Sequence, residues 1–171
     1  MTEFGAVRFR EIDSLSGSPS FDEFYRERRT EMARAVILAV ADRELGTEAT
    51  DEAFTRALES WAAVEAYENP EGWVYRVALN WARSRLRRRH RHLGAFLDDG
   101  RHFDGLPEPE LLEAVERLPY AYRSVVVARF FLDWSIEQTA EALNMPEGTV
   151  KTRPARALRR LRRALGVQDE S

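Results

Sequence analysis

The chain has 171 residues, of which 44% are hydrophobic, so it can bury the core of one domain or two small ones, and global disorder is excluded. The absence of cysteine excludes a disulfide scaffold, a thiolate zinc site and a cysteine nucleophile, and is typical of a reducing compartment. The longest uncharged apolar run, residues 35–41, is too short for a membrane span, and the N-terminus lacks the pattern of a signal peptide. The sequence therefore predicts a cytoplasmic protein without membrane insertion.

The formal net charge of -3 argues at face value against nucleic-acid binding. However, residues 76–91 and residues 151–165 each carry seven basic residues and no acidic one, while the rest of the chain carries 12 basic and 29 acidic residues. A single arginine-rich run is often only a solvated helix face. Two such runs, each at the end of an apolar-periodic segment, favour two contacts with a polyanion.

The periodicity of apolar residues predicts an all-α protein, because no segment shows the alternation typical of strands. A linker rich in glycine, proline and acidic residues interrupts the pattern and divides the chain. We therefore expect two small helical domains joined by a flexible acidic linker. Their boundaries are an N-terminal tail (1–19), a first domain (20–91), the linker (92–110), a second domain (111–166) and a C-terminal tail (167–171).

In the first domain, one helix is expected from about Phe21 until Gly46, and a second over residues 48–64 with an apolar stripe that includes Phe54 and Leu58. A third helix opens at Pro70. One of its faces is apolar, and another is an unbroken polar and cationic ridge formed by Arg76, Asn80, Arg83, Arg87 and Arg91.

In the second domain, a first helix stops at Pro119, and residues 120–132 form a strongly apolar central helix. Ser135 caps a short helix, with Gln138 completing a capping box. Pro146 opens a last helix that is apolar on one side and basic on the other. This order is a helix-turn-helix layout, although a plain helical hairpin with a basic face would give a similar pattern.

Two groups of motifs resemble the bacterial RNA polymerase sigma factors, in their extracytoplasmic-function (ECF) group. EATDEAFTRAL (residues 48–58) and PEGWVYRVALNWARSRLRRR (residues 70–89) are similar to region 2 of that family. LPYAYRSVVVARFFLDWSIEQTAEALNMPEGTVKTR (residues 118–153) is similar to region 4. The resemblance implies a non-enzymatic factor that binds core RNA polymerase and directs it to promoter DNA. Region 2 would read and melt the -10 element, and region 4 would read the -35 element.

The resemblance also implies site residues. The contact with core polymerase would involve Asp51, Glu52, Phe54 and Arg56. The -10 element would be bound by Tyr67, Asn69, Arg76, Asn80, Arg83 and Arg87. The -35 element would be bound by Thr149, Lys151, Thr152, Arg153 and Arg156, with Arg153 and Arg156 reading bases and Lys151 binding phosphate. An anti-sigma factor is a further implied partner. No cofactor or metal is expected, since the three histidines lack metal-ligand spacing.

Two aromatic residues and two departures from the family pattern leave questions open. Trp73 and Trp81 could stack on unpaired bases, but their spacing favours core packing. Pro154 replaces an apolar residue within the expected recognition helix, which should kink there or start afresh, and Thr139 replaces a buried isoleucine.

Two other interpretations of the chain remain open. The first is a DNA-binding regulator that uses only the helix-turn-helix, although this leaves the pattern of residues 54–91 unexplained. The second is a sigma-like protein that binds polymerase or an anti-sigma partner without selecting promoters.

Overall fold

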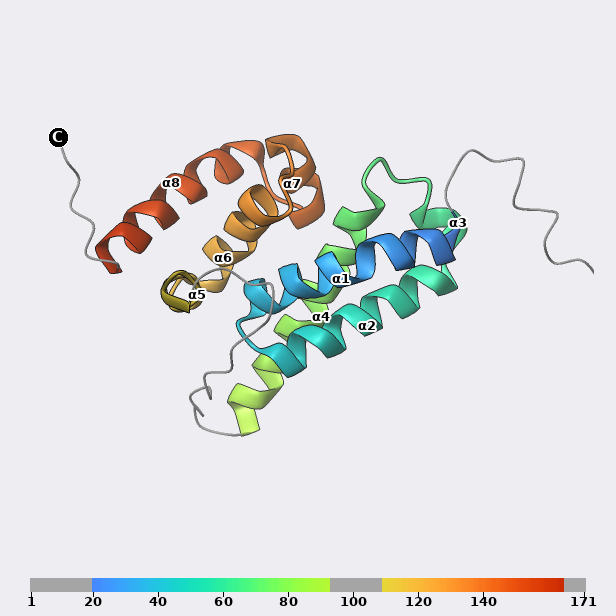
Figure 1. The fold of residues 1–171 in the computed structure, drawn as a ribbon, viewed down its shortest axis with the longest axis horizontal. Coiled ribbons are helices and arrows are strands. Elements are labelled where there is room, and N and C mark those ends of the chain that lie inside the picture. The colour runs from blue at the N-terminus through green and yellow to red at the C-terminus, as the bar shows by residue number, and fades with distance from the viewer. Residues whose placement is uncertain (1–19, 93–108, 165–171) are drawn as a thin grey trace, which may run out of the picture.

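The computed structural model describes residues 20–92 and 109–164, and every regular element within these ranges is helical (Figure 1). This confirms the all-α prediction. The N-terminal unit consists of α1 (Phe21–Val40), α2 (Arg43–Glu59), α3 (Trp61–Val64) and α4 (Pro70–His92). The C-terminal unit consists of α5 (Pro109–Glu116), α6 (Tyr120–Val126), the π-helical turn η1 (Val127–Phe131), α7 (Ile136–Leu143) and α8 (Glu147–Ala164). The tails and most of the expected linker lie outside the described residues.

The junction between α1 and α2 differs from the sequence expectation. Ala41 ends α1 in a left-handed conformation, and Asp42 caps α2, its Oδ1 accepting the Leu45 N–H at 2.9 Å. Gly46 therefore lies in the first turn of α2 rather than at the end of a helix. A Cβ at this position would come within 2.7 Å of the Ile37 Cα, so the glycine is needed for the close approach of the two helices. Gly46 therefore serves the packing of α1 against α2. A glycine that ends a helix gives the same sequence pattern, so the pattern alone cannot distinguish the two roles.

The short helix α7 begins as predicted. The Ser135 Oγ accepts the Gln138 N–H at 3.1 Å, and the Gln138 Oε1 accepts the Ser135 N–H at 2.8 Å. This is the expected capping box, and it fixes the start of the first helix of the helix-turn-helix. Asn144 then adopts a left-handed conformation and ends α7, which allows the tight turn into α8.

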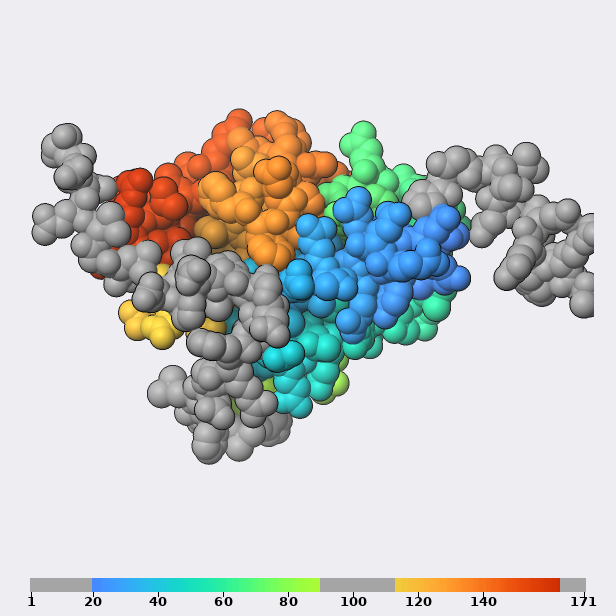
Figure 2. Space-filling model, viewed as in Figure 1, coloured from blue at the N-terminus to red at the C-terminus, as the bar shows by residue number. Residues whose placement is uncertain are grey.

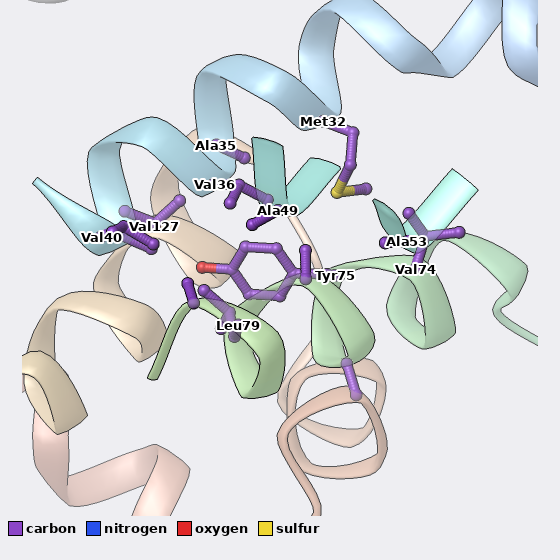
Figure 3. Packing of buried hydrophobic residues seen from close by; sticks show 14 of the residues in the cluster. Met32, Ala35, Val36, Val40, Ala49, Ala53, Val74, Tyr75, Leu79 and Val127 are labelled. Atoms are coloured by element: carbon purple, nitrogen blue, oxygen red, sulfur yellow. The ribbon is translucent and has the colours of Figure 1, made fainter. Parts of the chain in front are cut away.

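The two helical units share one hydrophobic core, which was not expected from the sequence. Tyr75 of α4 is fully buried at its centre, among Val36 of α1, Ala49 of α2 and Val127 of η1 (Figure 3). The space-filling view shows α1 directly against the C-terminal unit (Figure 2). A smaller cluster, which includes Leu118 and Leu161, lies between the first and last helices of the C-terminal unit. The chain thus packs its two units side by side instead of holding them apart.

Thr139 is completely buried at the position where the family pattern has isoleucine, and its hydroxyl has no hydrogen-bond partner among the described residues. A buried polar group without a partner destabilises the folded state. We expect Thr139→Val to raise the free energy of unfolding by about 1 kcal/mol, measured by urea denaturation.

The matched control is Thr152→Val, because Thr152 is exposed and its hydroxyl already donates to the Gly148 carbonyl at 3.1 Å. This control should change stability by less than about 0.5 kcal/mol. A Thr139→Val protein no more stable than the native protein would contradict the account of this hydroxyl.

Candidate nucleic-acid and polymerase interface

The part of the cationic ridge of α4 from Arg76 to Arg87 runs along one wall of a groove of about 1170 Å³. Four of the residues expected at the -10 element line this groove: Arg76, Asn80, Arg83 and Arg87. Arg88, which the sequence interpretation did not single out, lies beside them. Guanidinium groups pair well with phosphate oxygens, so the ridge can bind a polyanion.

Asn69 and Tyr67, the other two candidates for the -10 element, have different environments. Asn69 is only 8% exposed, and its Oδ1 accepts the Gly72 N–H at 2.8 Å at the start of α4. It therefore fixes the beginning of the helix, and in this conformation its side chain cannot read a base. Tyr67 is 44% exposed and can offer its ring to a partner.

Trp73 and Trp81 are partly buried and pack against the main core. The Arg85 guanidinium lies 4.7 Å from the centre of the Trp81 ring, which covers part of that ring with a cation–π contact. The structure thus favours core packing over base stacking for both residues.

The exposed face of α2 carries charged residues that are already paired. Asp51 binds Arg29 at 2.8 Å, and Arg56 binds Glu52 at 2.8 Å. Phe54, in contrast, is only 2% exposed, so in this conformation its side chain offers almost no surface for the expected contact with polymerase. It packs 5.8 Å from Phe24 and 5.2 Å from Tyr25 between ring centres, on the apolar stripe that holds α2 against α1.

Leu58 was expected on that buried stripe, but it is 56% exposed at the end of α2. Its position four residues after Phe54 suggested burial, but it lies in the last turn of α2, which ends at Glu59. Leu58 is therefore an apolar side chain on the same helix as the exposed Asp51 and Arg56. It is a candidate partner contact that the sequence pattern missed.

The recognition-helix residues divide into outward-facing and inward-facing groups. Lys151, Thr152 and Arg156 are exposed on α8, and Lys151 forms a weak ion pair with Glu147 at 3.6 Å. Arg153 is half-buried. It turns back into the C-terminal unit, donates to the Ala121 carbonyl at 2.9 Å and lines the groove beside α4. In this conformation it is not free to read a base.

Thr149 is half-buried in the first turn of α8, where its N–H donates to the Pro146 carbonyl at 2.9 Å. Further along α8, Arg156, Arg159, Arg160 and Arg163 form a cationic hollow with Tyr122. The Arg160 guanidinium lies 5.2 Å from the centre of the Tyr122 ring. Positive charge therefore continues along the exposed side of α8, beyond the residues expected to read bases.

Pro154 does not restart the recognition helix. The structure has one helix from Glu147 to Ala164 with the proline inside it. The expectation of a fresh start at Pro154 is therefore wrong, and a local kink stays a prediction. Because proline has no N–H, the Val150 carbonyl lacks its usual helical donor.

Known proteins with similar sequences decide the family. The sigma-70 region 4 family model matches residues 108–161. The ECF RNA polymerase sigma factor SigM of Mycobacterium tuberculosis is 33% identical over 152 residues, which cover 86% of this chain and 78% of that protein. RNA polymerase sigma factor SigV of Bacillus subtilis is 30% identical over 154 residues, 85% of this chain and 90% of that protein. The chain belongs to the ECF group of sigma-70 factors.

Two solved structures, one of them a sigma factor, have the same fold. The sigma factor RpoE of Bartonella quintana, in complex with the anti-sigma factor NepR, has a TM-score of 0.77 at 20% identity, covering 86% of this chain and 98% of that one. CnrH, in complex with the cytosolic domain of CnrY, has a TM-score of 0.60 at 20% identity, covering 87% of this chain and 89% of that one. At these identities the similarity concerns the fold alone.

Residues 20–92 and 109–164 of this sigma factor contain neither a helix long and apolar enough to cross a membrane nor a group of side chains that could hold a metal ion. The described surface carries positive charge on α4 and α8, and charges of both signs together with the apolar Leu58 on α2. As a sigma factor the protein is not an enzyme, and it directs RNA polymerase to promoters.

Proposed function

We propose that this sigma factor binds core RNA polymerase through the exposed side of α2 and contacts the two promoter elements through α4 and α8. The observation that carries the proposal is the distribution of surface charge. One helix face in each unit, on α4 and on α8, is cationic, whereas the exposed side of α2 carries charges of both signs and the apolar Leu58. Cationic faces suit the phosphates of DNA, whereas paired charges beside an apolar residue suit a protein surface. The protein would act in the cytoplasm, with its polymerase and DNA.

The -10 contact is proposed for Arg76, Asn80, Arg83, Arg87 and Tyr67, with Asn69 fixing the start of α4. The structure supports this role because Asn80, Arg83 and Arg87 are exposed on one side of α4, where they can follow a DNA backbone. An exposed aromatic ring at Tyr67 offers a stacking surface for an unpaired base.

The -35 contact is proposed for Lys151, Thr152 and Arg156, which are exposed along the first turns of α8. The N-terminal part of a recognition helix is the part that reaches base edges in the major groove. Arg153 can join this set only after it releases the Ala121 carbonyl, and Thr149 is half-buried in the first turn of α8.

The polymerase contact is proposed for Asp51, Glu52, Arg56 and Leu58. The buried Phe54 contributes indirectly, because it packs α2 against α1. We expect Leu58→Ser to weaken binding to core polymerase about tenfold, because burial of a leucine side chain at an interface contributes on the order of 1.5 kcal/mol. Binding can be measured by fluorescence anisotropy of labelled protein titrated with core enzyme.

The matched control is Leu158→Ser, the same substitution at an exposed leucine of α8, outside the proposed polymerase contact. Both variants should unfold at the temperature of the native protein, because neither side chain is buried. Native affinity in Leu58→Ser would place the polymerase contact elsewhere on the surface.

Run-off transcription with core polymerase on genomic fragments tests the proposed function. Initiation at specific sites supports a promoter-selecting sigma factor. Binding to core polymerase without initiation would instead support a sigma-like protein that does not select promoters. DNA binding without polymerase binding would support a regulator that uses only its helix-turn-helix.

A further inference from the structure

Met145 is a methionine that an oxidant can reach. It lies in the turn between α7 and α8, is half-buried and lines the groove beside α4. Met32, in contrast, is only 2% exposed in the main core, and Met1 lies outside the described residues. Because the chain has no cysteine, reversible two-electron oxidation of a side-chain sulfur can occur only at a methionine thioether.

The Met145 thioether touches a residue that was expected to read DNA. The Arg153 Nη1 lies 3.9 Å from the Met145 Sδ. The same nitrogen donates to the Ala121 carbonyl at 2.9 Å, which turns Arg153 into the C-terminal unit. A thioether sulfur is only a weak acceptor, so in the reduced protein Met145 adds little to this hold. Arg153 is thus kept inward mainly by one hydrogen bond to a neutral carbonyl, which a contact with DNA can replace.

The surroundings of Met145 favour a stronger acceptor at this sulfur. Among the described residues, the lining of the groove includes five arginines and no carboxylate: Arg76, Arg83, Arg87, Arg88 and Arg153. The backbone of the turn is fixed independently, because the Met145 N–H donates to the Ala140 carbonyl at 3.0 Å. A change at the sulfur therefore acts first on the guanidinium beside it and not on the path of the chain.

We propose that Met145 is a reversible oxidation site, whose sulfoxide retains Arg153 in its inward position and so weakens binding of the -35 element. The proposal rests on the -35 contact proposed above. The oxidant is hydrogen peroxide. The Sδ lone pair attacks one peroxide oxygen, so that an S–O bond forms and the O–O bond breaks, and the other oxygen leaves as water with both protons. Sulfur loses two electrons, peroxide gains two, and the charge of the protein is unchanged.

The sulfoxide acts on Arg153 because its oxygen accepts hydrogen bonds strongly, whereas a thioether does not. An oxygen added to Sδ on the side of Arg153 converts the 3.9 Å contact into a hydrogen bond with the guanidinium. Arg153 then has two acceptors in its inward position, and a hydrogen bond from a charged donor is the stronger kind. The fraction of molecules in which Arg153 is free for DNA falls, and the apparent affinity falls by the same factor.

Limited oxidation of the full chain with hydrogen peroxide tests the proposal. Peptide mass spectrometry should show Met145 gaining one oxygen at least about tenfold faster than Met32, because of its exposure. The oxidised protein should bind duplex DNA, taken from a promoter that run-off transcription identifies, about tenfold more weakly. A methionine sulfoxide reductase should restore the affinity. Oxidation of Met32 as fast as Met145, or an unchanged affinity after oxidation of Met145, would overturn the proposal.

Two variants separate the effect on Arg153 from general damage by peroxide. Met145→Leu keeps an apolar side chain of similar size, so we expect it to bind DNA like the reduced native protein and to be insensitive to peroxide. Arg153→Ala should show no further loss of affinity on oxidation of Met145, because the guanidinium that the sulfoxide retains is absent. An equal loss in oxidised Arg153→Ala and oxidised native protein would show that the sulfoxide acts on the turn itself, and would overturn the role of Arg153.

Met145→Gln provides the acceptor without any oxidant. Its side-chain carbonyl can accept from Arg153, so we expect it to bind the same duplex about threefold to tenfold more weakly than Met145→Leu. Equal affinity of these two variants would contradict the retention of Arg153 by an acceptor at this position.

The hold on Arg153 can also be measured without DNA. NMR relaxation of the Arg153 side-chain nitrogens reports their mobility, which should fall when Met145 is oxidised and recover on reduction. If the reduced protein neither binds promoter DNA nor initiates, the proposed function fails, and the retention of Arg153 is then judged by this mobility alone. A mobility unchanged by oxidation would overturn the proposal while the promoter-directing function stands.

Discussion

Arg123→Ala is expected to lower the free energy of unfolding by about 3–4 kcal/mol. Arg123 is only 8% exposed, and its guanidinium donates to four backbone carbonyls: Ala39, Val40, Glu116 and Leu118. Burial lowers the pKa of Arg123, while the nearby Tyr120 and Glu116 oppose this shift. Removal of the side chain leaves a cavity and takes the donor from all four carbonyls. Urea denaturation followed by circular dichroism measures the loss.

Arg117→Ala is the matched control, since Arg117 lies six residues earlier and its side chain is 68% exposed beside Glu113. Exposed ion pairs contribute little, so this variant should lose no more than about 0.5 kcal/mol. If Arg123→Ala lowers the free energy of unfolding as little as the control does, the hydrogen bonds of Arg123 do not hold α1 against the C-terminal unit, and this account is contradicted.

Pro154→Leu is expected to raise the free energy of unfolding by about 2–3 kcal/mol. The reason is that an interior proline withholds the N–H that would bond the Val150 carbonyl and crowds that carbonyl. Part of the gain is offset, because proline also restricts the unfolded chain. A more regular helix should align Lys151 with Arg156, so we also expect tighter binding to -35 DNA. Thermal denaturation and anisotropy with duplex DNA measure the two effects.

Pro146→Ala is the control for that substitution, because Pro146 directly precedes the first residue of the same helix. A proline before a helix withholds no helical hydrogen bond, so its replacement should change stability far less. An unchanged melting temperature and an unchanged DNA affinity in Pro154→Leu would contradict the kink.

The helices were predictable from the sequence because each depends on local signals. The capping box of Ser135 and Gln138 and the periodic apolar residues of α4 and α8 specify those elements within a few residues. The arginine ridge was predictable for the same reason, since its spacing alone places it on one face. Gly46 was misassigned because a glycine gives the same local signal whether it ends a helix or allows two helices to approach.

The packing of the two units could not be predicted in the same way. Tyr75 lies on the apolar side of α4. This pattern is the same whether helices of one unit or of both units cover that side, so it does not predict the shared core. Trp134 lies beside a helix break, so the periodicity of apolar residues does not predict whether its side chain is buried. The inward turn of Arg153 has the same cause, because it depends on the position of the Ala121 carbonyl in another helix. Tertiary contacts of this kind leave no periodic trace in the sequence.

Mapping the 5′ ends of transcripts tests the central claim most directly. Core polymerase would transcribe total genomic DNA from the organism that encodes the chain, with and without the protein. We predict a set of new start sites that share one pair of sequence elements, about 10 and 35 base pairs upstream. Transcripts with the same 5′ ends in both reactions, or new start sites that share no such elements, would contradict the assignment of this chain as a promoter-selecting sigma factor.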